Sequence, residues 1–368
     1  MSTLLHILDD AGLGGVTRFL DALERRLMPD IRQARMIVNP LKDLLPALDA
    51  DLVVIHFTMS WSKLPYLLAL RARRGKRPIV LIEHSYTAAF ERRHVRTPKR
   101  FRTMLRLAYA LVDRVVAVSY GQAAWMRRAR LLHAEKLTVI APFTDCETLS
   151  VLPPPAAHSG PLRLGAYGRF CGQKDFPNLI AAMQLVDPLV ATLIIRGFGP
   201  DADALHACAR ELPHVEVGDK LDNLHQFLAS VDAIVVPSAY EPFGQVALEA
   251  RLAARPLIVT DVDGLPEQVE PAAGLIVPPG DPAALAAAIV QLAAQRTAGN
   301  YRAMAWAARA SAMDHVTTST HRWHDLVAHL TASRRGTSPT RVFLSDVDTG
   351  SRQANAAIQN ARACSPVN

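Results

Sequence analysis

Short apolar runs, each followed by a helical stretch, recur along the first part of the chain. The runs are rich in Val, Ile and Leu and almost uninterrupted, which is typical of parallel strands covered by helices on both faces. The strands predicted here are Leu4–Leu8, Arg35–Val38, Asp51–Phe57, Ile79–His84, Arg114–Ser119 and Leu137–Pro142. The pattern therefore predicts a doubly wound α/β domain over residues 1–152.

A second series of the same kind begins after a proline-rich segment. Residues 153–161 are rich in Pro and small residues, which favours a stiff linker between two domains. The strands predicted beyond it are Leu162–Gly168, Ala191–Gly197, Val215–Gly218, Ala233–Ser238 and Pro256–Asp261. We expect a second α/β domain over residues 162–310, a helix over 311–332, and a disordered tail over 333–368, where the sequence is polar and lacks periodicity.

Composition supports a globular protein of two domains. The chain has 368 residues, of which 50% are hydrophobic and 20% charged. Its first residues lack a basic region, and no apolar run approaches the roughly 18 residues that a membrane span needs, so neither a signal peptide nor a span is predicted. The four cysteines are scattered without metal-ligand spacing. We therefore expect a reduced, cytoplasmic, metal-free protein.

Positive charge is concentrated in the first domain. Residues 63–130 contain 17 Lys and Arg against three acids, although the whole chain carries a net charge of only +7. Such asymmetry indicates an anionic partner, which could be a membrane surface, a nucleic acid or an acidic substrate. The alternative is that these side chains form solvated helix faces without a partner.

Two loops of the second domain carry candidate chemistry. Glu241 follows the predicted strand Ala233–Ser238, and Glu249 lies eight residues later on the next predicted helix. Arg169 and Lys174 follow the first strand of the same domain and precede a helix, where cations and backbone N–H groups suit a diphosphate. Because the carboxyl ends of parallel strands share one edge of the sheet, both loops are expected at that edge.

Four segments in order resemble the signatures of retaining GT-B glycosyltransferases of family 4. They are GRFCGQK (168–174), RGFGPD (196–201), PSAYEPFGQVALEA (237–250) and the segment 255–282. The first domain is similar more loosely, through GLGGVTR (12–18), in which Thr17 stands where many members have Glu. The resemblance implies two Rossmann-like domains facing across a cleft, the first binding the acceptor and the second the nucleotide sugar, with the C-terminal helix crossing back to the first domain.

The resemblance also implies roles for particular residues. Glu241 would face the donor sugar, and His84 would contact that sugar or the reacting centre; these are the two catalytic candidates. His56 also falls at a strand end, where it is either structural or directed at the cleft. The expected donor-binding residues are Arg169 and Lys174 for the diphosphate, Glu249 for the ribose, Phe243 and Gly244 through their N–H groups, and Gly14 and Gly15 of the first loop.

The function implied is transfer of a sugar, with retention of configuration, from a nucleotide diphosphate to a saccharide acceptor. We expect a lipid-linked acceptor, a role in exopolysaccharide, capsule or lipopolysaccharide synthesis, and attachment to the inner face of the cell membrane through residues 63–130. No cofactor, metal or nucleic acid is expected, and Asp261–Asp263 only mimics a metal motif of another fold. The alternatives are a nucleotide-sugar epimerase and a non-catalytic basic protein; UDP, GDP and ADP donors remain open.

Overall fold

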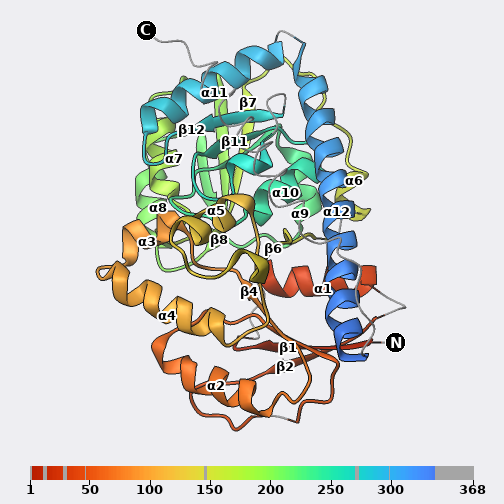
Figure 1. The fold of residues 1–368 in the computed structure, drawn as a ribbon. Helices are drawn as coiled ribbons and strands as arrows, with labels where there is room; N and C mark the ends of the chain where they lie inside the picture. Colours follow the sequence, from red (N-terminus) through yellow and green to blue (C-terminus); the bar gives the residue numbers. More distant parts are fainter. Residues whose placement is uncertain are drawn as a thin grey trace. The chain divides into compact units, whose positions relative to one another are not determined.

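The computed structural model describes residues 2–10, 15–27, 31–45, 47–144, 147–269, 273–297 and 299–335. These residues form two compact units (Figure 1). The first unit runs to Thr144 and resumes at Val316, and the second runs from Glu147 to His315. Residues 336–368, which make up most of the predicted tail, lie outside the described part of the chain.

The first unit contains a six-stranded parallel sheet in the order β2-β1-β3-β4-β5-β6. Its strands are β1 (Ser2–Leu8), β2 (Ile31–Ile37), β3 (Leu52–Ile55), β4 (Ile79–Glu83), β5 (Arg114–Ala117) and β6 (Leu137–Val139). Its helices are α1 (Gly15–Leu27), α2 (Leu64–Arg73), α3 (Ala88–His94), α4 (Pro98–Ala110) and α5 (Tyr120–Arg128), with 3₁₀ turns at Trp61–Lys63 and Ala134–Lys136.

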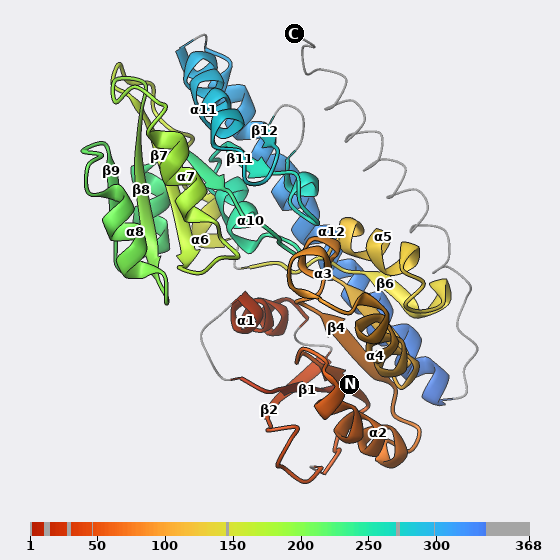
Figure 2. The same ribbon diagram turned by 90° about the vertical axis from the view of Figure 1, so that its left-hand side faces the viewer.

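Successive side chains of β1 point to opposite faces of this sheet, because a β-strand is pleated. Leu5 and Ile7 belong to the core that the sheet forms with α2, α4 and α5. His6, between them, is hydrogen-bonded to Gln33, whose amide donates to the carbonyl of Leu23 on α1. Helix α1 lies on the opposite side of the sheet from α2 (Figure 2). The sheet is therefore covered on both sides, as the near-continuous apolar strands predict.

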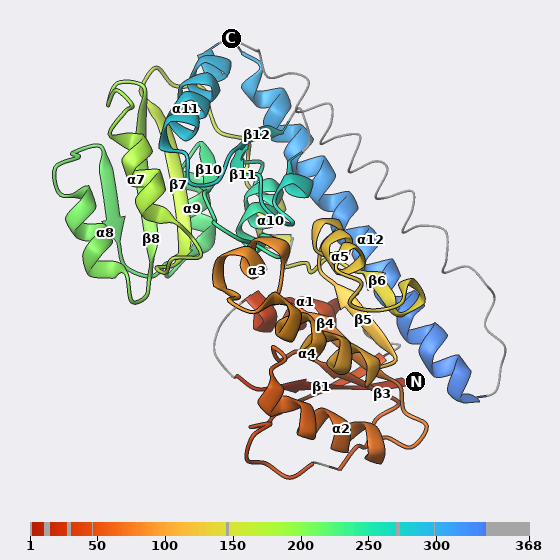
Figure 3. The ribbon, with the colours of Figure 1, turned by 60° about the vertical axis from the view of Figure 1, so that its left-hand side comes forward.

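The second unit has a six-stranded parallel sheet in the order β12-β11-β10-β7-β8-β9. Its strands are β7 (Leu162–Arg169), β8 (Ala191–Phe198), β9 (Val215–Gly218), β10 (Ala233–Val236), β11 (Leu257–Thr260) and β12 (Gly274–Val277). Its helices are α6 (Glu147–Ser150), α7 (Phe176–Met183), α8 (Ala202–Ala209), α9 (Leu224–Ser230), α10 (Gln245–Leu252) and α11 (Pro282–Thr297), with a 3₁₀ turn at Pro266–Gln268. Helices α7, α8 and α11 pack on one face of the sheet, and α9 and α10 on the other (Figure 3).

The final helix, α12 (Tyr301–Arg335), starts ten residues before the predicted position and is continuous. It belongs to the second unit up to His315 and to the first from Val316. Within the second unit, the Tyr301 hydroxyl donates to the Asp232 carbonyl at 2.6 Å. Within the first, the buried Trp323 ring packs 6.1 Å from the ring of Phe19 on α1. Despite its length, neither α12 nor any other described helix is apolar enough to span a bilayer.

The predicted strands are all present, with two differences. β2 begins four residues earlier than expected, because an edge strand can carry the polar residues of Ile31–Arg35 without burying them. β12 was not predicted, because its short apolar run is bounded by Pro and Gly residues that are typical of a loop. Both differences concern strands at the end of a sheet, where the hydrophobic pattern is weakest.

Candidate active site

The order of the second sheet reverses between its neighbouring strands β7 and β10. In parallel α/β sheets, ligands bind at the carboxyl ends of the strands at such a switch point. The loop after β7 carries Lys174 and the loop after β10 carries Glu241, and the Lys174 ammonium lies 2.5 Å from the Glu241 carboxylate. The Ser238 hydroxyl donates to the same carboxylate at 3.3 Å. The structure thus brings together the cation and the carboxylate that the sequence places 67 positions apart.

Hydrogen bonds from a third loop hold the backbone of Glu241. The Asp263 carboxylate accepts from the Glu241 N–H at 3.1 Å, and the Gly264 N–H donates to the Glu241 carbonyl at 3.1 Å. On the other side, the Ala239 N–H donates to the Gln173 carbonyl at 2.8 Å, which ties this loop to that of Lys174. Asp263 therefore helps to hold the Glu241 backbone. In the sequence it stood out only because Asp261–Asp263 resembles a metal motif.

Gly244 sits directly before helix α10 in a left-handed conformation, with φ at 98°. A Cβ at this position would lie 2.6 Å from Cδ2 of Leu265, so both the backbone angle and the space favour glycine. The first N–H groups of a helix have no partner within it and are available to an oxygen atom outside. Gly244 is the residue immediately before this start, and Phe243 precedes it.

Glu249 lies on α10 but is completely buried, with an exposed fraction of 0%. Its carboxylate accepts a hydrogen bond from the Tyr167 hydroxyl at 2.7 Å, and Tyr167 belongs to the central strand β7. A ribose could therefore reach Glu249 only after a local movement of the groups that cover it. No sequence pattern indicates this contact, because Tyr167 lies in an apolar strand 82 positions away.

Arg169 is the last residue of β7, and its side chain is exposed. The next residue, Phe170, lies against the two glycines of the RGFGPD segment. A Cβ on Gly197 would come within 2.0 Å of the Gly168 carbonyl oxygen, and one on Gly199 within 2.3 Å of that of Phe170. Both glycines are therefore required for the close packing of the loop that presents Arg169 and Lys174.

In the first unit, His84 follows β4 and joins a line of hydrogen-bonded side chains. Its Nε2 lies 3.2 Å from Nδ1 of His56, and Nε2 of His56 lies 2.9 Å from Nδ1 of His6. The line ends at Gln33, whose Oε1 lies 3.1 Å from Nε2 of His6. His56 and His84 also stack, with ring centroids 5.4 Å apart. His56 thus contacts the candidate catalytic His84 directly, and both predicted histidines belong to one cluster.

Burial dominates the electrostatics of these histidines, because an imidazolium is poorly solvated inside the protein. It lowers the pKa of His6 and that of His84 to about 4. The pKa of His56 also falls well below its usual value, mainly through burial and then through the charges of His6 and His84. All three rings are therefore neutral at pH 7.

The glycine-rich first loop is described only in part. Gly14 lies outside the described residues, whereas Gly15 is the first, exposed residue of α1. Thr17, at the position where the resembling family often has Glu, lies on the first turn of α1. Within the described part of the chain, no three His, Cys, Asp or Glu side chains form a group that could hold a metal ion.

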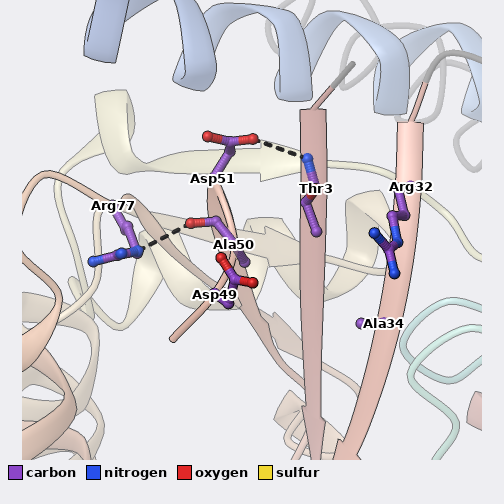
Figure 4. Close-up of a pocket in the computed structure, with 7 residues that line it drawn as sticks. All are labelled: Thr3, Arg32, Ala34, Asp49, Ala50, Asp51 and Arg77. Atoms are coloured by element: carbon purple, nitrogen blue, oxygen red, sulfur yellow. Dashed lines mark hydrogen bonds between the residues drawn. The ribbon is translucent and has the colours of Figure 1, made fainter. Parts of the chain in front are cut away.

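One cavity of about 310 Å³ lies elsewhere in the first unit, at the amino ends of its strands. It is lined by Thr3, Arg32, Ala34, Asp49, Ala50, Asp51 and Arg77 (Figure 4). The Asp51 carboxylate accepts from the Thr3 N–H at 3.0 Å, and Arg77 donates to the Ala50 carbonyl at 3.0 Å. Because His84 follows the carboxyl end of β4, this cavity occupies the opposite edge of the sheet and is separate from the candidate site.

Three residues of the site were missed by sequence analysis, His6, Gln33 and Tyr167, and the role of a fourth, Asp263, was not recognised. His6 and Tyr167 lie within strands, where a polar side chain among apolar ones was the only available signal. Gln33 lies on the part of β2 that was not predicted as a strand. Asp263 was noticed, but as part of a possible metal motif.

Comparisons with known proteins agree with this architecture. Residues 12–148 match the domain described as Glycosyltransferase Family 4, and residues 161–295 match Glycosyl transferases group 1. A lipopolysaccharide core biosynthesis glycosyltransferase, LpsD of Rhizobium meliloti, is 31% identical over 196 residues, which is 50% of this chain and 54% of that protein. The chain matches only 28–54% of the length of its curated relatives.

Two solved structures share the fold over most of the chain. HepE of Anabaena in complex with UDP has a TM-score of 0.70 and 20% identity, covering 89% of this chain and all of that one. Sucrose-phosphate synthase of Thermosynechococcus elongatus has a TM-score of 0.72 and 21% identity, covering 90% of this chain and all of that one. With the two domain matches, these likenesses show that the chain belongs to the GT-B glycosyltransferases with family 4 and group 1 domains.

Proposed function

We propose that the protein is a retaining glycosyltransferase that moves a hexosyl group from a nucleotide diphosphate to a saccharide acceptor. The observation that carries the proposal is the Lys174–Glu241 pair at the switch point of the second sheet. A sugar diphosphate presents an anionic group next to a group rich in hydroxyls. An ammonium beside a carboxylate is complementary to both parts of such a donor.

Each side chain of the pair then has a separate task. Lys174, with the exposed Arg169, would neutralise the diphosphate and the negative charge that grows on it as the glycosidic bond breaks. Glu241 would accept hydrogen bonds from the sugar hydroxyls, and the N–H groups of Phe243 and Gly244 would donate to its oxygens. Retention needs no second carboxylate if the acceptor attacks on the face that the diphosphate leaves.

Glu249 is proposed to accept hydrogen bonds from the ribose hydroxyls. Its burial and its bond with Tyr167 mean that the donor must displace part of its cover before this contact forms. The binding of UDP by HepE supports a nucleoside diphosphate donor, although the base and the sugar stay open for this chain. No metal is proposed, because Arg169 and Lys174 supply positive charge and Asp263 already binds the Glu241 N–H.

The acceptor is proposed to be a saccharide linked to a lipid, presented at the inner face of the cell membrane. Exposed cations gather on α3, on the turn after it and on the start of α4: Arg92, Arg93, Arg96, Lys99 and Arg100. Arg100 also lies 5.8 Å from the ring of the partly exposed Trp61, and Leu107 of α4 is 47% exposed. Cations with exposed apolar side chains suit an anionic lipid surface. The match to LpsD supports a role in cell-surface glycan synthesis.

A thermal-shift screen of UDP-, GDP- and ADP-sugars in EDTA tests the donor proposal. We expect one nucleotide class to raise the melting temperature of the wild type by several degrees, and the Lys174→Met variant to lose most of that shift. Lys76→Met, which removes an exposed lysine from a turn of the first unit, is the matched control. The proposal fails if no nucleotide sugar stabilises the protein, or if the screen gives the same shift with Lys174→Met. Isomerisation of the donor without any acceptor would indicate an epimerase instead.

A further inference from the structure

The line of side chains that ends at His84 has a direction, and Gln33 sets it. The Gln33 amide nitrogen donates to the Leu23 carbonyl at 3.3 Å. The reverse orientation of the amide would place two carbonyl oxygens against each other. The Gln33 oxygen therefore faces His6, and because it can only accept, Nε2 of His6 must carry the proton.

Each later bond follows from the one before it. A neutral imidazole has one N–H and one lone pair, so Nδ1 of His6 is an acceptor, and Nε2 of His56 must donate to it. The same reasoning makes Nδ1 of His56 an acceptor for the Nε2–H of His84. Nδ1 of His84 is then left with a lone pair. The only tautomer of His84 that satisfies the whole line presents this nitrogen as a hydrogen-bond acceptor.

Protonation of the line is disfavoured by its surroundings. An imidazolium at His6 or His56 would turn an acceptor into a donor and set two N–H groups face to face. Burial lowers the pKa of all three histidines, and the positive charge of Arg35 on β2 lowers that of His6 and His56 further. Arg35 is itself paired with Asp21 and Glu24 of α1.

The middle of the line is buried, whereas both of its ends, Gln33 and His84, are partly exposed. His6 is completely buried and His56 nearly so, with exposed fractions of 0% and 7%. His84, after the carboxyl end of β4, is only partly buried. Because ligands of parallel α/β sheets bind at the carboxyl ends of the strands, a substrate would meet the line at His84, and Gln33, which lies within β2, would act through His6 and His56.

We propose that Gln33, His6 and His56 are positioning residues that lock His84 in the Nε2–H tautomer, so that its Nδ1 receives a hydroxyl group of the substrate. The proposal rests on the proposed function, because that function supplies the sugar and acceptor hydroxyls. A lone pair accepts from a hydroxyl and repels the oxygens of phosphates, carboxylates and carbonyls. His84 would thus select and orient a hydroxyl, without providing positive charge for the diphosphate.

Long-range ¹H–¹⁵N spectra of ¹⁵N-histidine-labelled protein at pH 8 test the tautomers without any substrate. The signals of His6, His56 and His84 are assigned with single His→Gln variants. We expect all three rings to be neutral and protonated on Nε2. A His84 ring protonated on Nδ1, or on both nitrogens, overturns the inference.

A variant series tests the role of Gln33. Gln33→Met removes the acceptor at similar size, and we expect His84 to become a mixture of tautomers and kcat/KM to fall at least tenfold, with the Kd for the nucleoside diphosphate unchanged. Gln33→Glu keeps an acceptor oxygen towards His6, although its second oxygen then faces the Leu23 carbonyl, so it should restore the single tautomer of His84 at pH 8. Arg32→Gln, one residue earlier on β2 and exposed, should change neither the tautomer nor kcat/KM. A single His84 tautomer in Gln33→Met, or a mixture of His84 tautomers in Gln33→Glu, contradicts the proposal.

The two proposals fail in different ways. If the wild type shows the expected tautomers but transfers no sugar to any acceptor, the proposed function is refuted and the hydrogen-bonded line stands. If sugar is transferred while His84 carries its proton on Nδ1, only the inference about the line is overturned.

Discussion

Glu241 and Glu249 are eight positions apart in the sequence, yet their carboxylates meet different partners. Glu241 pairs with Lys174 at the end of the sheet, whereas Glu249 is buried beneath the Tyr167 hydroxyl. An ion pair whose two side chains remain 10–16% exposed can be exchanged for a ligand. A buried carboxylate also stabilises the fold, because losing it leaves its partner without a hydrogen bond. Substitutions of the two glutamates should therefore differ in their effect on stability as well as on catalysis.

Glu241→Ala should lower kcat by tenfold or more, because Glu241 is proposed to contact the sugar. It should leave nucleoside diphosphate binding as tight as in the wild type or tighter, because Lys174 loses its competing partner. Glu249→Ala should weaken nucleoside diphosphate binding at least tenfold. It should also lower the free energy of unfolding by about 1–3 kcal/mol, because the buried Tyr167 hydroxyl loses its acceptor. Calorimetric titration, steady-state kinetics and urea unfolding measure the three quantities.

Tyr167→Phe is the matched control for this pair of variants. It removes the same hydrogen bond but keeps the Glu249 carboxylate, so stability should fall while nucleoside diphosphate binding is retained. Equal loss of binding in Glu249→Ala and Tyr167→Phe would show that Glu249 acts through the fold and not through the ribose.

At the level of elements, neighbouring parallel strands bring distant residues to one place. β1, β3 and β4 are adjacent, so His6, His56 and His84 form one line although they are up to 78 positions apart in the sequence. The same principle joins the loops after β7 and β10. In each sheet, the order of the strands therefore decides which residues, distant in sequence, form a cluster.

The neutral histidines make stability depend on pH. The pKa of His6 is about 4 in the folded protein and near 6.5 in an unfolded chain, so unfolding takes up a proton between these values. The stabilisation is fully present above about pH 6.5 and is lost as the pH falls towards 4. For His6 alone it is on the order of 3 kcal/mol. Urea unfolding at several pH values should therefore show a shallower decline between pH 6.5 and 4 for His6→Asn than for the wild type. A parallel decline would show that His6 is charged in the folded state.

The sequence predicted the elements better than the contacts between them. Apolar runs revealed nearly every strand, and a loop after a strand was enough to place Lys174 and Glu241 at one edge. The hydrogen bonds of His6 with Gln33 and of Tyr167 with Glu249 depend on the order of the strands and on the face of the sheet that each side chain occupies. The local sequence pattern determines neither of these two properties. The hydrogen bond from the Tyr167 hydroxyl to Glu249 could not be predicted, since a tyrosine in an apolar strand is usually part of the core.

At the scale of the whole molecule, charge is distributed unevenly between the units. Within the basic stretch 63–130, Arg71 and Arg74 pair with Asp113, and Arg102 pairs with Glu91. The exposed cations of α3 and α4 are a different set, and they lie together along the chain. These exposed cations are available to an anionic surface.

Binding to vesicles that contain anionic lipid should depend on this set. Each cation near such a surface contributes about 1 kcal/mol, so a variant with Arg92→Ser, Arg93→Ser and Arg96→Ser should bind about a hundredfold more weakly in a co-sedimentation assay. The control changes three exposed cations of the second unit, Arg210, Lys220 and Arg302, to Ser. Equal loss in both variants, or wild-type binding that 0.5 M salt leaves unchanged, would argue against a specific membrane-facing surface.

The Lys174–Glu241 pair has a consequence for product release. A partly buried ammonium left without a counter-charge is costly, so a site with Lys174 alone would tend to retain the nucleoside diphosphate after transfer. As the diphosphate departs, the Glu241 carboxylate can pair with the Lys174 ammonium again. The carboxylate that is proposed to orient the incoming sugar thereby also acts as an internal substitute for the outgoing anion, which favours turnover over tight product binding.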